Sequence, residues 1–168
     1  MSEAPRPEPW LRGPIPGLDP LLAPPIHALL QAREDLEHHT FDLSEEQIWS
    51  HPHGLPSLGF HLRHIAGSLD RLTTYLEGGE LSADQLAFLG AEQAAGADRE
   101  ELVGGVFAAI DRSTAVIRSL NPERLKDARA VGRRHLPTTV IGLAVHLAEH
   151  TQRHVGAAIT LCRFLQAG

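Results

Sequence analysis

The stretch SLGFHLRHIAGSLDRLTTYL, residues 57–76, decides the fold of this chain together with VIGLAVHLAEHTQRHVGAAITLCRF, residues 140–164. In both stretches apolar residues recur every three or four positions, which is the spacing of one face of an α-helix. Ser57 can cap the start of the first stretch, and Gly78-Gly79 follow its end, where glycine commonly terminates helices. Two long amphipathic helices are therefore expected, each burying one apolar face.

Outside these two stretches the chain predicts two more long helices. One begins near Pro25, and the other covers about residues 98–120. The capping-box pattern of residues 44–47 predicts a short helical turn, and residues 82–94 predict a short helix. The polar connection at 121–137 shows no convincing strand alternation. Four amphipathic helices without strands predict an all-α fold, a four-helix bundle.

The N-terminal segment differs in composition, since eight of the twelve prolines lie within residues 1–25. Proline removes amide donors and favours extended backbone, so residues 1–19 are predicted to form an extended arm and residues 20–168 the bundle. The first few residues are expected to be disordered. Trp10 has two interpretations: it pins the arm onto the bundle, or it is an exposed tail residue.

Composition excludes several functional classes. The formal net charge of −6 argues against a nucleic-acid partner, because such proteins neutralise phosphates with a basic face. Cys162 is the single cysteine, so neither an internal disulfide nor a thiolate metal cluster can form. The N-terminus lacks the apolar core of a signal peptide, and no apolar run reaches the roughly 20 residues of a membrane span. We therefore expect a cytoplasmic protein without membrane partners.

Histidine placement is the strongest chemical signal. The predicted second helix carries His61 and His64, and the last carries His146, His150 and His154. Side chains four residues apart share a helix face, and two such imidazoles can converge on one metal ion. The same spacing also suits separate imidazoles with their own hydrogen-bond partners, and spacing alone does not choose. Most of the remaining histidines are expected on the surface or in loops. His27 is the exception, because it lies near the start of the first helix and could reach a metal bound by these histidines.

The strings GFHLRHIAGS at residues 59–68 and HTQRHVG at 150–156 resemble the two signatures of the DinB/YfiT-like superfamily. The resemblance extends over about residues 20–165. It implies a four-helix bundle with an up-down-down-up arrangement, commonly as a homodimer. It also implies a zinc or nickel ion held by one histidine of the second helix and an H-x-x-x-H pair of the last.

Carried over by position, the resemblance implies His64, His150 and His154 as metal ligands. His61 and His146 are then expected to line the pocket or support the ligands, and His146 in place of His154 is an alternative ligand. Three histidines leave an open coordination position, where a metal-bound water or thiolate is expected to provide the nucleophile. The expected function is a thiol S-transferase or hydrolase acting on a small molecule, with a low-molecular-weight thiol as partner. The alternative is a non-catalytic metal-binding stress or interaction protein.

Other residues near these motifs have simpler interpretations. Glu149 could act as a base or support His150, although a solvated surface carboxylate is favoured. Asp70 and Arg71 are interpreted as a salt-bridge pair or a pocket rim. Cys162 is expected to be a small buried core residue.

Overall fold

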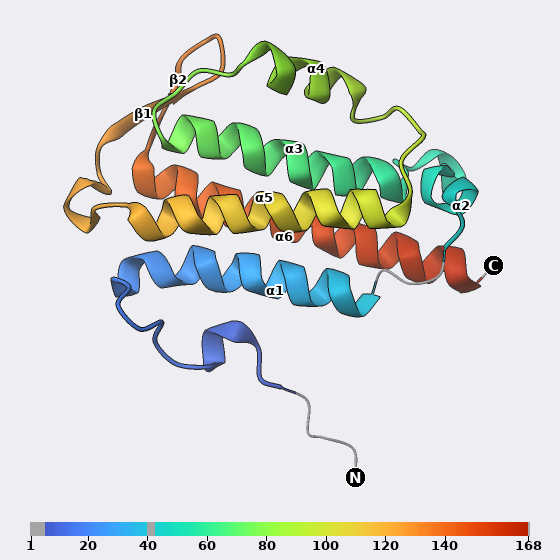
Figure 1. The fold of residues 1–168 in the computed structure, drawn as a ribbon, viewed down its shortest axis with the longest axis horizontal. Coiled ribbons are helices and arrows are strands. Elements are labelled where there is room, and N and C mark those ends of the chain that lie inside the picture. Colours follow the sequence, from blue (N-terminus) through green and yellow to red (C-terminus); the bar gives the residue numbers. More distant parts are fainter. Residues whose placement is uncertain (1–5, 40–42, 168) are drawn as a thin grey trace.

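Four long helices lie side by side and form most of the molecule (Figure 1). The computed structural model describes residues 6–39 and 43–167. Most of the described residues are helical, which confirms the predicted all-α class. The long helices are α1 (Ala23–His39), α3 (Leu58–Leu76), α5 (Arg99–Ser119) and α6 (Val140–Ala167), and the short ones are α2 (Glu45–Trp49) and α4 (Ala83–Ala91).

The helix starts follow from capping side chains in the sequence. The Phe60 backbone N–H donates to the Ser57 hydroxyl at the start of α3, as expected. Helix α2 begins with the predicted capping box of Ser44, and α4 begins with a second one. After α3 the chain turns at Gly78, whose φ of +86° suits a residue without Cβ.

The core lies where the long helices contact one another. Helix α3 packs against α5 and α6, and α1 packs against α6 and α5. Aliphatic side chains fill this space, as the low aromatic content predicts. The largest fully buried ones include Leu29, Leu36, Leu62, Ile65, Leu69, Leu76, Ile117, Leu143 and Leu147.

A β-hairpin in the connection between α5 and α6 corrects the sequence prediction of a polar loop. Strands β1 (Ala128–Val131) and β2 (Leu136–Thr139) pair antiparallel, with Ala128 opposite Thr139. The turn uses left-handed backbone at Gly132 (φ +69°) and His135 (φ +47°). Each strand has four residues and faces mainly solvent, so neither length nor apolar alternation marks it in the sequence.

The proline-rich segment lies against α1, but Trp10 does not hold it there. The Trp10 side chain is 63% exposed, and its indole N–H donates to Glu8 at 2.6 Å. The interpretation of Trp10 as an exposed residue is therefore correct. Arg12 fastens the segment instead, with two bonds of 2.6 Å to the carboxylate of Glu34 in α1. The disorder expected at the start of the chain falls on residues 1–5, outside the described residues.

None of the described helices combines the length and the hydropathy needed to cross a membrane.

Candidate metal centre

Three histidines from two long helices meet at one place. His64 of α3 and His150 and His154 of α6 each offer a ring nitrogen, and these nitrogens lie within 4.8 Å of one another. All three side chains are partly buried. We call these residues the histidine cluster. Helix α6 places His150 and His154 on one face, and the packing of α3 against α6 brings His64 to them.

The imidazole rings of the cluster are in direct contact. His64 Nε2 lies 2.9 Å from His150 Nε2. The ring of His154 lies 4.4 Å from that of His64 and 4.7 Å from that of His150, measured between centroids. One ion coordinated by all three rings would satisfy nitrogens that otherwise face one another.

The protonation states suit metal ligation. Burial away from water, followed by repulsion from the neighbouring His64, lowers the pKa of His150 and of His154 to about 4. Both rings are therefore neutral near pH 7 and have a lone pair to donate. Metal ions bind imidazole in this neutral form.

Glu92, directly after α4, orients the cluster from outside. Its carboxylate accepts the Nδ1–H of His64 at 2.7 Å and a bond from Arg71 at 2.7 Å, and its side chain is only 4% exposed. A carboxylate accepts hydrogen bonds only, so Nδ1 of His64 carries the proton that it donates to Glu92, and Nε2 is the ring nitrogen that a metal ion can bind. A carboxylate behind a ligating histidine fixes the ring in this way in many metal sites.

The Glu92 carboxylate fits against α3 because Gly67 has no side chain. A Cβ at Gly67 would lie 2.6 Å from a Glu92 oxygen and 2.7 Å from the Arg71 guanidinium. Any side chain there would displace the Glu92–Arg71 pair, so a glycine is needed on this face of α3.

His61 supports the cluster without joining it. Its Nδ1 lies 3.0 Å from Nδ1 of His154, which leaves Nε2 of His154 without a partner among the described residues. His61 is buried, and burial followed by the charge of His64 lowers its pKa. His61 therefore lies next to the histidine cluster, and its role there stays a prediction.

The three histidines fit a metal ion. Two nitrogens bound to one tetrahedral zinc at 2.0–2.1 Å lie roughly 3.3 Å apart. The His64–His150 separation of 2.9 Å needs to open by only a few tenths of an ångström. The donors are imidazoles, and a buried carboxylate, that of Glu92, supports His64, a set typical of transition-metal sites.

A cavity of about 290 Å³ lies beside the cluster. His61 lines it, next to its bond with His154. The remaining lining is apolar or small: Leu55, Pro56, Gly156, Ala157, Thr160 and Leu161.

The other candidates on α6 lie at the surface. His146 is exposed and bonds to Glu149 at 2.6 Å, although its ring is 5.3 Å from that of His150. Glu149 also pairs with Arg153 at 2.7 Å, and this bond lowers the pKa of its carboxyl group. Glu149 is thus a surface carboxylate, as favoured from the sequence. The structure does not bring His27 or His146 into the histidine cluster.

The interpretation of Asp70 and Arg71 as a pair with each other is wrong. Neighbouring residues of a helix point about 100° apart, and each finds a different partner. Asp70 pairs with Arg112 of α5, whereas Arg71 pairs with Glu92. Cys162 is buried in the core, as predicted.

A family comparison places this geometry among known proteins. The model of the DinB superfamily matches residues 28–158, most of the chain. The chain belongs to the DinB superfamily. The DinB match contains the histidine cluster, His61 and Glu92, while the proline-rich segment, His27 and Cys162 lie outside it. A search of curated proteins found no match to this DinB protein.

Glu92 is the functional residue that the sequence interpretation missed. It lies in the connection between α3 and α5, where neither periodicity nor a motif marks it. An indirect signal was available. Arg71 lies about one helical turn after the motif that ends at Ser68, and it is buried. A buried arginine needs an acidic partner, so a carboxylate from another part of the chain could be expected.

Proposed function

We propose that this DinB protein binds zinc or nickel through His64, His150 and His154 and acts as a metal-dependent enzyme on a small molecule. The proposed reaction is transfer of a low-molecular-weight thiol or hydrolysis. The observation that carries the proposal is the convergence of three ring nitrogens within 4.8 Å, two of them on His150 and His154, whose pKa values are lowered to about 4.

The surroundings of the cluster support a catalytic use. A zinc or nickel ion held there would supply Lewis acidity toward a thiol or a water molecule. Glu92 holds the proton of His64 on Nδ1, and His61 donates to or accepts from His154. The cavity of about 290 Å³ is lined by His61, which contacts His154, and it could take a small apolar group of a substrate.

The alternative function is a non-catalytic metal-binding protein. A fourth protein ligand would close the coordination sphere and favour this alternative. His61, His146 and His27 are not part of the group that could hold the ion. An ion held by three histidines alone would keep a coordination position for a substrate, which supports the enzyme over the alternative.

The arrangement of the helices is part of the same proposal. Contacts of α3 with α5 and α6, and of α1 with α6, support a DinB-like four-helix bundle with up-down-down-up order. The homodimer implied by the family resemblance remains a prediction, as do the cytoplasmic location and the division into arm and bundle at residue 19. Sedimentation analysis of the untagged protein tests the dimer.

Metal content is the decisive experiment. We expect about one zinc or nickel ion per untagged chain by elemental mass spectrometry, and loss of this ion in His64→Ala and in His150→Ala. Helical circular dichroism should persist in both variants, because α3 and α6 bury extensive apolar faces without the ion.

His146→Ala is the matched control, since it removes a histidine from the same helix one turn away. We expect this variant to keep its metal because His146 lies outside the cluster. Absence of metal uptake by the wild type, or full retention of metal in His150→Ala, would contradict the proposal. Unfolding on metal loss would instead support the non-catalytic alternative, because a structural ion contributes directly to folding.

A further inference from the structure

A larger cavity lies at the other end of α3, away from the histidine cluster. Its volume is about 600 Å³, within the roughly 300–1,000 Å³ typical of small-molecule sites. Tyr75, in its wall, follows His64 by eleven residues, so it lies about 16 Å farther along the helix axis. We call it the hairpin cavity, because strand β1 and the turn that follows it in the β-hairpin form one wall.

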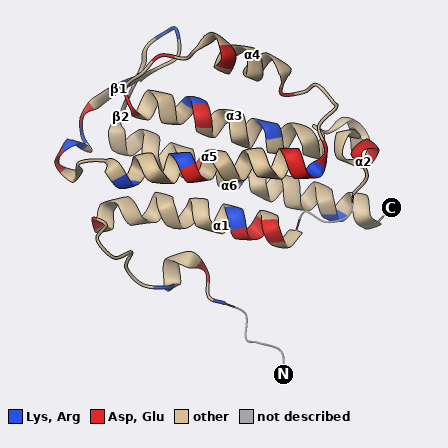
Figure 2. Ribbon diagram, in the orientation of Figure 1, with Lys and Arg blue, Asp and Glu red and all other residues tan. Residues whose placement is uncertain are grey.

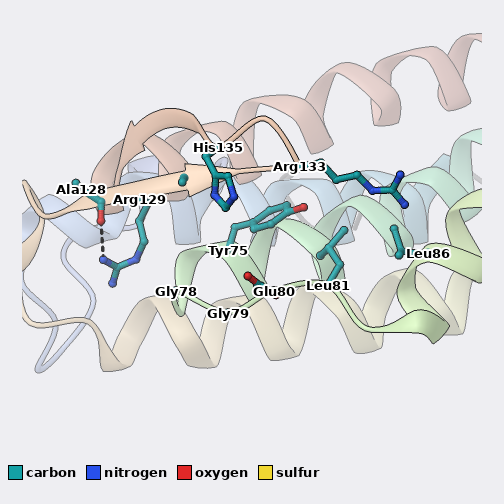
Figure 3. Close-up of a pocket in the computed structure, with 12 residues that line it drawn as sticks. Tyr75, Gly78, Gly79, Glu80, Leu81, Leu86, Ala128, Arg129, Arg133 and His135 are labelled. Atoms are coloured by element: carbon teal, nitrogen blue, oxygen red, sulfur yellow. Dashed lines mark hydrogen bonds between the residues drawn. The ribbon is translucent and has the colours of Figure 1, made fainter.

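Two parts of the chain that are distant in sequence enclose the hairpin cavity. The end of α3 and the loop after it contribute Tyr75, Gly78, Gly79, Glu80 and Leu81, and α4 adds Leu86. The opposite wall is the hairpin. Figure 3 shows His135 pointing from the hairpin toward the Tyr75 ring, with Arg129 and Arg133 at opposite ends of the cavity.

The lining is cationic in a protein that is acidic as a whole. Arg129 and Arg133 line the cavity against one carboxylate, that of Glu80, which leaves one positive charge with His135 neutral. The whole chain carries −6. Figure 2 shows basic residues at the hairpin turn, whereas acidic residues are spread over the helices.

Several polar groups of this lining have no partner in the described part of the chain. The Arg133 guanidinium, the Tyr75 hydroxyl and the His135 ring make no hydrogen bond or ion pair there. Arg129 has no carboxylate partner either. It donates to the backbone carbonyls of Leu76 and Ala128, each at 3.0 Å, so its position is fixed while its charge stays uncompensated.

We propose that the hairpin cavity is a second binding site, separate from the metal centre, for a small organic anion that carries an aromatic or apolar body. Arginine forks pair with carboxylate or phosphate oxygens, and Arg133 has all its donors available. The Tyr75 and His135 rings, with Leu81 and Leu86, give the body of the ligand an apolar and aromatic surface. The glycines at 78 and 79 add no side chain that would fill the space.

Titration of the ¹⁵N-labelled full chain with phenyl phosphate, followed by amide chemical shifts, tests the site. We expect saturable shifts at Gly78, Gly79 and Gly132, with a dissociation constant in the millimolar range or tighter, as for a small fragment. Phenol has the same ring without the charge and should bind at least about tenfold more weakly. Benzoate and inorganic phosphate identify whether carboxylate or phosphate oxygens, and the aromatic body, are required.

Arg133→Gln should weaken binding of phenyl phosphate about tenfold or more, because a charge-assisted hydrogen bond is lost. Arg134→Gln is the matched control: it removes the same charge from the next residue, which does not line the cavity, and should change binding less than about twofold. Equal weakening by both variants would overturn the proposal, because non-specific electrostatic attraction to the positive charges of the hairpin turn would then explain the binding. Shifts confined to Gly156, which lines the cavity beside the histidine cluster, would also overturn it, as would no saturable shift.

Discussion

The histidine cluster and the hairpin cavity both include residues of α3, but they differ in how their charged side chains are paired. At the cluster the charged groups are paired with one another: Glu92 accepts from His64 and Arg71. At the hairpin cavity the guanidinium of Arg133 has no partner among the described residues. The first arrangement holds side chains in one geometry before anything binds, whereas the second leaves donors available at the surface.

This difference follows from burial. A charge removed from water must be paired, so the interior can keep Arg71 only together with Glu92. The hairpin is exposed, and water satisfies Arg133 until an anion replaces it. Substitutions of the buried Glu92–Arg71 pair should therefore affect stability and metal binding together, while substitutions at the hairpin should affect ligand binding with little effect on stability.

The largest effect is expected from Glu92→Ala. Removal of this carboxylate leaves the Arg71 guanidinium, 10% exposed, without a counter-ion. We expect a loss of about 3–5 kcal/mol in the free energy of unfolding. Urea unfolding followed by circular dichroism, with a chelator present to exclude the contribution of bound metal, measures it.

Glu149→Ala is the control for this prediction, since Glu149 is the carboxylate next to His150 in sequence but lies at the surface. It should change stability by less than about 0.5 kcal/mol. In the conservative variant Glu92→Gln, metal affinity should fall by about 10- to 100-fold, because His64 loses the partner that orients its ring. Equal losses of stability in the two alanine variants would mean that Glu92 does not act as a buried partner.

The next largest effect is expected from steric clash. Alanine substitutions of glycines in the two regions separate the cost of a clash from the cost of an unfavourable backbone conformation. Gly67→Ala places a Cβ within 2.6–2.8 Å of Glu92, Arg71 and Phe88, so we expect a destabilisation of about 1–3 kcal/mol. Gly132→Ala in the hairpin turn meets no atom within 4 Å, but its φ of +69° should cost about 1 kcal/mol. The same unfolding measurement ranks the two variants.

Gly104→Ala in α5 is the reference for both. This position has open space and ordinary helical backbone, so alanine should stabilise the protein by about 0.5–1 kcal/mol. If Gly67→Ala behaved like Gly104→Ala, the tight packing of Glu92 behind the cluster would not hold in solution.

The contrast between the two regions also explains what the sequence could predict. Long helices repeat their pattern over many turns, so α3 and α6 and the shared face of His150 and His154 could be predicted from spacing. That His64 reaches this pair depends on how α3 packs against α6, which the local pattern does not contain. The family resemblance supplied it, and the structure agrees.

The connections between the long helices have no such repeated pattern, and both features that the sequence did not predict, Glu92 and the β-hairpin, lie in connections. Glu92 follows a nine-residue helix whose placement over α3 is decided by tertiary contacts. The hairpin has strands of four residues with a proline at 137, a composition typical of a loop. The N-terminal segment is a third case: the sequence left two interpretations of Trp10 open, and it did not indicate that Arg12 would fasten the segment to α1.

The smallest effect is expected for an ion pair that is only partly exposed, Arg12 with Glu34. Its exposure is intermediate between that of the buried Glu92–Arg71 pair and that of the hairpin. The hydrogen bond from Arg12 lowers the pKa of the Glu34 carboxyl group. A pKa that is lower in the folded protein adds stability above the ordinary glutamate value of about 4.3, and this contribution disappears as the pH falls through the lowered value. The segment around Arg12 should therefore be held at neutral pH and loosen as the pH falls below the ordinary glutamate value.

Amide ¹⁵N relaxation of residues 10–13 measures this loosening. Glu34→Gln should show increased mobility of the segment already at pH 7, with little further change on acidification, because the group that titrates has been removed. Asp111→Asn, in α5, removes the ion-pair partner of Arg33, the residue next to Glu34 in α1, and should leave the segment unchanged. If Glu34→Gln kept the segment rigid at neutral pH, contacts other than the ion pair, such as the buried ring of Pro9, would hold it to α1.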